Sequence, residues 1–73
     1  MLKLPVLSGK EVVRILSRFG YEKVRQRGSH MRIACAGRRS VTVPDYKSID
    51  RSLLLKVLRD ADLSVEEFIQ ATR

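Results

Sequence analysis

Apolar side chains recur with the period of an α-helix near the start of the chain. They fall at Val12, Val13, Ile15, Leu16 and Phe19, which places them on one face of a helix. Ser8 and Glu11 have the spacing of a capping box, and Gly20 is a suitable stop. We therefore predict a helix between Ser8 and Gly20, preceded by an extended lead-in over residues 1–7.

The next part of the chain alternates with a period of two, which is typical of β-strands. Strands are expected over residues 21–27, 30–36 and 40–43, separated by turns at 28–29 and 37–39. Strict alternation puts one apolar set against the helices: Val24, Met31, Ile33, Cys35, Val41 and Val43. The opposite, open face then carries His30 and Arg32, near the arginines of the first strand.

Strict alternation along the first strand also places Lys23, Arg25 and Arg27 on one side. Glu22, Val24 and Gln26 take the other side. We therefore expect the basic side chains of this strand to lie together on the open face.

Two further helices are predicted in the last third of the chain. Asp50 is a good N-cap for the first of them, whose apolar face holds Leu53, Leu54, Val57, Leu58 and Ala61. Leu55 falls off this stripe, and it either contacts the last helix, which we expect, or is exposed as part of a protein-binding surface. Ser64 and Glu67 form a second capping box, which opens a short C-terminal helix.

The order of elements is therefore α-β-β-β-α followed by a short C-terminal helix. An α+β fold, with a three-stranded antiparallel sheet and the helices on one face, is the economical way to bury these apolar stripes. A length of 73 residues predicts a single domain over residues 1–73 with a small core.

The cysteine and histidine content limits which disulfides and metal sites the chain can form. Cys35 is the only cysteine and His30 the only histidine, so a disulfide within the chain and a structural zinc site are excluded. We expect no metal and no cofactor. No stretch is long and apolar enough for a signal peptide or a membrane span, which predicts a reducing, cytoplasmic setting.

The net charge of +7 is unevenly distributed along the chain. Residues 1–19 carry +3, residues 20–47 carry +5 and residues 48–73 carry −1, and arginines outnumber lysines ten to five. Clustered arginine favours planar recognition of phosphate, which suggests a polyanionic partner, with nucleic acid as the first candidate. A solubilising surface is the competing interpretation of the charge.

His30 lies inside the most basic stretch, directly after a Gly-Ser turn. A titratable ring among guanidinium groups is what a small ribonuclease would need, because the arginines hold phosphate while the imidazole moves protons. The simpler interpretation is a surface histidine at a hairpin corner, and composition alone favours it.

Several short segments, in this order and spacing, carry a family resemblance. They are Leu4-Pro-Val-Leu-Ser-Gly-Lys-Glu, Phe19-Gly-Tyr, Arg27-Gly-Ser-His, Arg39-Ser-Val-Thr-Val-Pro and Leu53…Leu58…Leu63-Ser-Val-Glu-Glu-Phe. Together they resemble the HicA toxin family, also called YcfA-like, which comprises small bacterial mRNA interferases of toxin–antitoxin pairs. Family members often carry histidine after Val-Pro, where this chain has Asp45-Tyr46.

The resemblance implies a fold like the double-stranded-RNA-binding domain, endoribonuclease activity and a HicB-type antitoxin as partner. It also assigns catalysis to the histidine of the Gly-Ser-His motif, which here is His30. We expect the antitoxin to cover the His30 face and the free toxin to be a monomer.

RNA supplies its own nucleophile, the 2′-hydroxyl, so no serine, cysteine or metal is required for cleavage. We expect His30 to accept the 2′-hydroxyl proton. The expected RNA-binding residues are Lys23, Arg25, Arg27, Ser29, Arg32, Arg39 and Lys47. Ser29, Tyr46 and Lys47 are the candidates for a second proton-transfer group.

Two other classes of function stay open. The first is a non-catalytic module that binds double-stranded RNA by its shape. It predicts duplex binding that survives loss of His30, without cleavage by the wild type. The second is a protein-interaction domain whose basic face docks an acidic partner, which predicts salt-sensitive protein binding and indifference to RNA.

Overall fold

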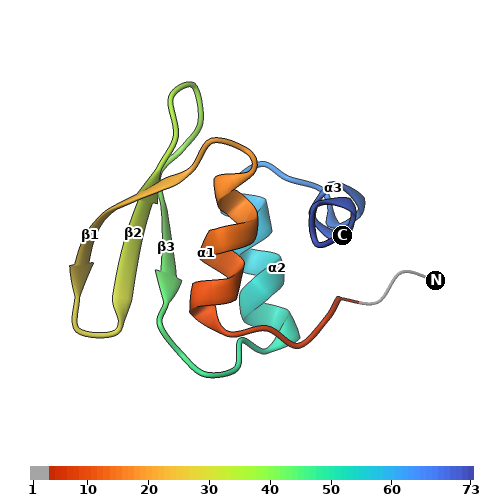
Figure 1. Cartoon of the computed structure of the whole chain (residues 1–73), viewed down its shortest axis with the longest axis horizontal. Helices are drawn as coiled ribbons and strands as arrows, with labels where there is room; N and C mark the ends of the chain where they lie inside the picture. The colour runs from red at the N-terminus through yellow and green to blue at the C-terminus, as the bar shows by residue number, and fades with distance from the viewer. Residues whose placement is uncertain (1–3) are drawn as a thin grey trace.

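The computed structural model describes residues 4–73, and it contains three helices and three strands. In chain order they are α1 (Gly9–Ser17), β1 (Glu22–Arg27), β2 (His30–Ala34), β3 (Val41–Pro44), α2 (Arg51–Asp60) and α3 (Val65–Ala71). The predicted order of elements and the α+β fold class are confirmed. Figure 1 shows α1 and α2 on one side of the sheet and α3 at the end of the molecule far from the strands.

The sheet is antiparallel throughout, with β2 between β1 and β3. Met31 and Ile33 of β2 pair with Val43 and Val41 of β3, and all four side chains are buried against the helices. The helices contribute the other side of the core: Val12, Ile15, Leu16, Leu54, Val57, Leu58 and Phe68. This packing leaves the other face of the sheet uncovered.

All three predicted helix caps are present. The Ser8 hydroxyl accepts a hydrogen bond from the Glu11 amide, and the Glu11 carboxylate accepts one from the Ser8 amide. Ser64 and Glu67 repeat this reciprocal pair at α3, and an Asp50 carboxylate oxygen accepts from the Leu53 amide at 2.8 Å. Each cap satisfies amides that the first helical turn leaves without a backbone partner.

The predicted alternation along β1 is wrong. The pairing with β2 shifts between Lys23 and Arg25, which is the signature of a β-bulge. Val24 is 61% exposed, so it does not belong to the core. The bulge pairs Lys23 with Ile33, on the face that the helices cover, whereas Arg25 pairs with Arg32 on the open face.

Other boundaries differ by one or two residues from the predicted ones. β2 ends at Ala34, because the Arg38 amide donates to the Cys35 carbonyl in a turn that begins there. The half-buried Cys35 packs against the core, and its thiol donates to the Phe19 carbonyl. β3 begins at Val41 and includes Pro44.

Leu55 is 37% exposed and lies outside the buried core, so its expected contact with the last helix stays a prediction. The lead-in before α1 contributes one bridge to the fold, in which the Ile49 amide donates to the Leu7 carbonyl at 2.7 Å. The part of the predicted lead-in over residues 1–3 lies outside the described residues.

The backbone at the start of α1 packs directly against the backbone at the end of β3. Gly9 is buried, and its amide donates to the Tyr46 carbonyl at 2.9 Å. A Cβ atom at this position would collide with the Pro44 carbonyl oxygen. Glycine is therefore required here by close approach, and it holds the first turn of α1 against the end of β3.

Candidate catalytic and RNA-binding site

Five side chains line a small hollow on the open face of the sheet. They are Arg25 and Arg27 of β1, His30 and Arg32 of β2, and Thr42 of β3. The hollow has a volume of about 90 Å³, so it accepts a group the size of a phosphate and not a large ligand. The structure thus brings the only imidazole together with three guanidinium groups.

Strand pairing accounts for this arrangement. Arg27 pairs directly with His30, and Arg25 pairs with Arg32, so each pair points to the same side of the sheet. The Gly28-Ser29 turn connects the two strands, and Gly28 has a φ of +54°. Nothing lies within 4 Å of a Cβ built on Gly28, so its backbone conformation, and not lack of space, favours glycine there.

Thr42 is a member of this site that the sequence analysis did not single out. It pairs with Arg32, and its hydroxyl accepts a hydrogen bond from Arg32 Nη1 at 2.9 Å. The signal was present, because Thr42 alternates with the buried Val41 and Val43 and must therefore point to the open face. Its effect is to fix the direction of one guanidinium group.

The remaining predicted RNA-binding residues are spread over the molecule. Ser29 lies in the turn beside His30, and Lys47 is exposed in the loop that follows β3 at the same end of the sheet. Lys23 lies on the other face, where its ammonium group donates to Gln26 Oε1 at 2.9 Å. Arg39 precedes β3 at the far end of the sheet, and its carbonyl accepts from the Tyr21 hydroxyl at 2.8 Å.

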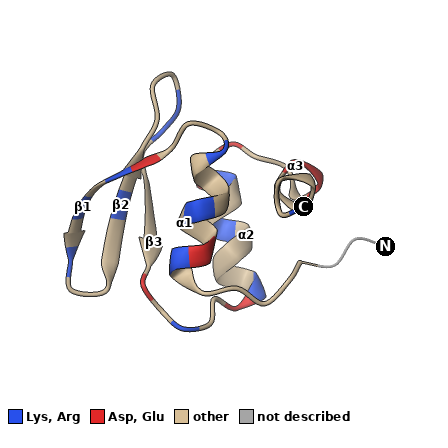
Figure 2. Cartoon of the chain, viewed as in Figure 1, with Lys and Arg blue, Asp and Glu red and all other residues tan. Residues whose placement is uncertain are grey.

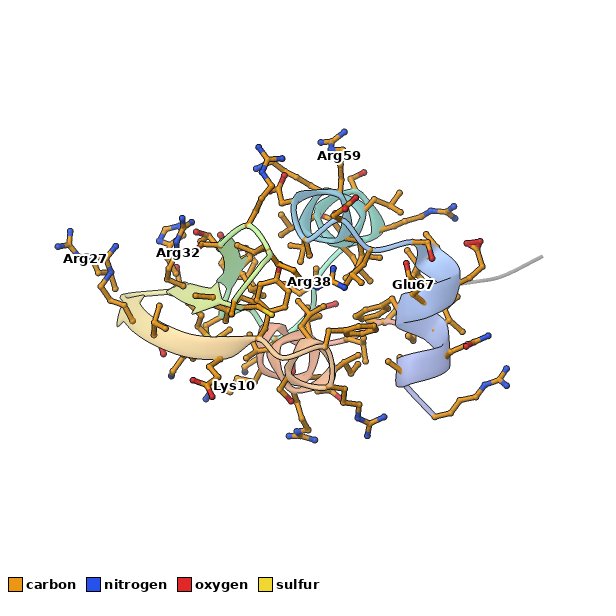
Figure 3. All side chains as sticks on the ribbon, turned by 90° about the horizontal axis from the view of Figure 1, so that it is seen from above. Lys10, Arg27, Arg32, Arg38, Arg59 and Glu67 are labelled. Carbon is orange, nitrogen blue, oxygen red and sulfur yellow. The ribbon has the colours of Figure 1, made fainter. Side chains whose placement is uncertain are left out.

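Two other arginines are used within the fold. Arg18 donates to the carbonyls of Ala71 and Arg73 at the end of α3, and Arg38 donates to the Ala61 carbonyl at 3.0 Å. Figure 2 shows the basic residues distributed over strands, loops and helices. In Figure 3, Arg27 and Arg32 lie close together at the sheet, well apart from Arg59 on α2. The grouping around His30 is therefore distinct from the general excess of positive charge.

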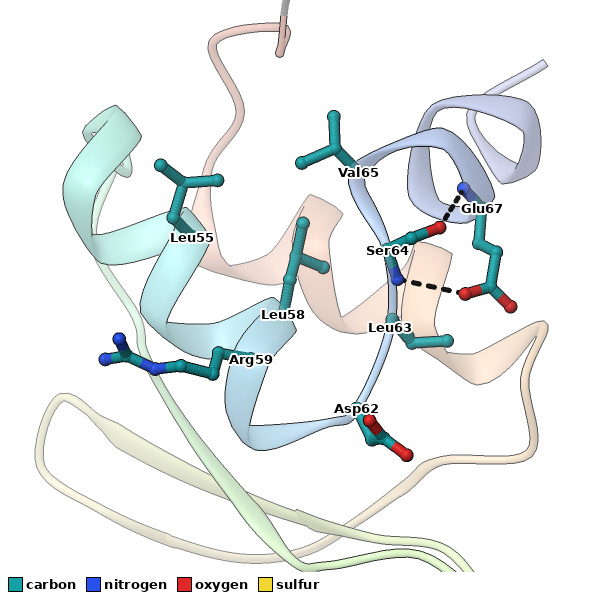
Figure 4. Close-up of a pocket in the computed structure, with 8 residues that line it drawn as sticks. All are labelled: Leu55, Leu58, Arg59, Asp62, Leu63, Ser64, Val65 and Glu67. Carbon is teal, nitrogen blue, oxygen red and sulfur yellow. Dashed lines mark hydrogen bonds between the residues drawn. The ribbon is translucent and has the colours of Figure 1, made fainter.

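A larger groove, of about 540 Å³, lies between α2 and the start of α3. Figure 4 shows Leu55 and Val65 on its two sides, Arg59 and Asp62 at its lower end, and Glu67 on the right beside Ser64. Its lining contains neither the histidine nor the arginines of the sheet. Size alone does not identify a reactive site, so we place the candidate chemistry in the hollow around His30.

Three groups have displaced pKa values, each with a local cause. Hydrogen bonds from the backbone and hydroxyl of Ser8 lower the pKa of Glu11, and those of Ser64 do the same for Glu67. Burial raises the pKa of the Tyr21 hydroxyl. These groups belong to the helix caps and the core, and they contribute to stability and not to the hollow.

Within residues 4–73 no three His, Cys, Asp or Glu side chains gather in a way that could hold a metal ion. None of the helices described is long and apolar enough to cross a membrane.

Comparison with known proteins bears on the same part of the chain. No curated protein and no solved structure matches it. A family model described as "HicA toxin of bacterial toxin-antitoxin" matches residues 9–63, a span that runs from the first turn of α1 to the residue before the Ser64 cap and includes the whole sheet. Since this match covers well over half of the 73 residues, the chain belongs to the HicA toxin family of toxin–antitoxin systems.

Proposed function

We propose that this protein is a metal-independent endoribonuclease that cleaves mRNA in the cytoplasm as the toxin of a type II toxin–antitoxin pair, with His30 as its catalytic acid/base. One observation carries the proposal: the only imidazole of the chain shares a hollow with Arg25, Arg27 and Arg32 on the uncovered face of the sheet. Membership of the HicA toxin family supports the same activity.

In the proposed reaction His30 accepts the proton of an RNA 2′-hydroxyl. The oxygen attacks the adjacent phosphorus, the new P–O2′ bond closes a 2′,3′-cyclic phosphate, and the P–O5′ bond breaks. The departing 5′-oxygen takes a proton from solvent, to which the hollow is open. A positioned acid/base group typically accelerates such a step by ~10²–10⁴.

The arginines hold the phosphate on which this chemistry takes place. Negative charge builds up on the phosphoryl oxygens as the 2′-oxygen attacks, and preorganised guanidinium groups stabilise that charge. Arg32 is held in direction by the Thr42 hydroxyl, while Arg25 and Arg27 come from the neighbouring strand. Ser29 and Lys47, at the same end of the sheet, extend contact to flanking phosphates.

The antitoxin proposed for this toxin is a HicB-type protein that covers the His30 face. An acidic surface on that partner would complement the three arginines and would block RNA from the hollow. In the absence of antitoxin we expect a monomer.

The direct test is His30→Ala in purified protein assayed with single-stranded RNA. We expect the cleavage rate to fall by ~10²–10⁴, because the proton acceptor is lost. RNA binding should persist, because the arginines remain. Lys56→Ala, an exposed change on α2, is the control and should cleave as the wild type does.

Undiminished cleavage by His30→Ala would contradict the proposal. A wild type that binds duplex RNA and cleaves none would instead indicate a non-catalytic binding module.

A further inference from the structure

A chain of hydrogen bonds lies on the side of β1 opposite the arginines of the hollow. Lys23 Nζ donates to Gln26 Oε1 at 2.9 Å. Gln26 Nε2 in turn donates to the Gly28 carbonyl at 3.0 Å and to Asp45 Oδ2 at 3.1 Å. We call these three side chains, Lys23, Gln26 and Asp45, the turn brace.

The donors and acceptors of the turn brace are matched in one orientation only. Gln26 presents its oxygen to an ammonium group, which only donates, and its amide nitrogen to a carbonyl and a carboxylate, which accept. The reverse orientation would set donor against donor and acceptor against acceptor. The amide is therefore fixed by its three partners.

The backbone of Asp45 also contacts the Gly28-Ser29 turn. The Asp45 amide donates to the Ser29 carbonyl at 2.6 Å. Both carbonyls of the Gly28-Ser29 turn thus receive a hydrogen bond from Gln26 or Asp45. These contacts tie the turn to the residue that follows β3.

The turn matters because His30 is the next residue along the chain. His30 pairs with Arg27 on one side and with Pro44, the residue before Asp45, on the other. A turn that moved would carry the imidazole with it, whereas Arg32 and Thr42, farther along their strands, would stay in place. Displacement of a catalytic group by about 1 Å can cost about 10²-fold in rate.

We propose that Gln26 and Asp45 are positioning residues, which fix the Gly28-Ser29 turn and thereby hold the His30 imidazole against the arginines. Lys23 supports Gln26 and does not bind RNA. This inference rests on the proposed ribonuclease function, and it adds residues that contact neither RNA nor His30.

The test uses Gln26→Leu and Asp45→Ala in the full chain, with Gln70→Leu, an exposed change on α3, as the matched control. We expect kcat to fall by about 10- to 100-fold in the first two variants with KM nearly unchanged. Asp45→Asn retains an oxygen acceptor for Gln26 and should restore most of the activity. Thermal melting of each variant shows that the fold is kept.

His30 also provides a readout that does not depend on cleavage. Because the chain has one histidine, its imidazole gives a single Hε1 resonance that is followed directly by NMR. We expect this resonance to move in Gln26→Leu and Asp45→Ala and to stay in place in Gln70→Leu and Asp45→Asn.

Wild-type kcat together with an unmoved resonance in Gln26→Leu and Asp45→Ala would overturn the inference. That result differs from failure of the proposed function, which would appear as full activity of His30→Ala whatever the state of the turn brace.

Discussion

Thr42 illustrates how a single side chain sets the geometry of the hollow. Its hydroxyl accepts from Arg32 Nη1, and both residues lie on the open face of the sheet. A guanidinium group held in one direction needs less ordering when it binds phosphate.

We therefore expect Thr42→Val, which keeps the branched shape, to weaken RNA binding. Loss of one hydrogen bond is worth about 1 kcal/mol, or roughly fivefold in Kd. Fluorescence anisotropy in the His30→Ala background measures this without cleavage of the RNA. An unchanged Kd would show that Arg32 does not depend on Thr42.

At the residue scale, the sequence predicted which arginines lie beside His30, but it did not predict on which face of the sheet every basic side chain lies. Arg25 and Lys23 are both basic and two positions apart in β1, yet one lies beside His30 and the other donates to Gln26 on the opposite face. Residue type and strict alternation do not separate them, because the difference arises from where the bulge falls.

The helices are the elements for which sequence reasoning was most reliable. The capping boxes at Ser8 and Ser64 are local patterns of four residues, so their outcome does not depend on distant parts of the chain. β1 is different, because its register depends on pairing with β2. All six of its residues are exposed, which leaves no apolar pattern to specify which face is which.

The capping boxes predict a component of acid sensitivity. Hydrogen bonds from Ser8 and Ser64 hold the pKa values of Glu11 and Glu67 below the ordinary value of 4.5. A carboxyl with a lowered pKa in the folded state contributes stability above its ordinary pKa, and this contribution is lost as the pH falls through the folded-state pKa.

We therefore expect the melting temperature of the wild type to exceed that of a Glu11→Gln, Glu67→Gln double variant at neutral pH. The gap should narrow steadily as the pH falls below about 4.5. Thermal melts at a series of pH values measure it, with Glu66→Gln as the control because Glu66 is an exposed neighbour of the α3 cap pair. A gap that is constant with pH would contradict this assignment.

For the whole molecule, the important quantity is how its positive charge is divided. Arg18 at the end of α1 and Arg38 in the turn between β2 and β3 donate to backbone carbonyls elsewhere in the fold, whereas three guanidinium groups line the hollow with His30. The net charge of +7 therefore overstates the positive charge that is gathered at the hollow.

The salt dependence of RNA binding measures how many basic side chains contact phosphate. With the three arginines of the hollow and Lys47 on phosphates of single-stranded RNA, the slope of log K against log salt should be about −2.8, a loss of roughly 50-fold between about 50 and 200 mM. Arg25→Ala should reduce the slope by about 0.7. Arg59→Ala, on the distant surface of α2, is the matched control and should leave it unchanged. Equal effects of the two variants would indicate binding by general charge.

At Gly9 the helical layer contacts the sheet that carries His30 without any side chain between them. The missing methyl lets the helix rest on the carbonyl of Pro44, the cross-strand neighbour of His30. Adding one carbon atom by mutation would thus push directly on the strand that flanks the imidazole. A substitution at the buried Gly9 should therefore lower the proposed activity although this residue lies apart from the hollow. Random mutagenesis that is screened for loss of activity should recover substitutions of Gly9.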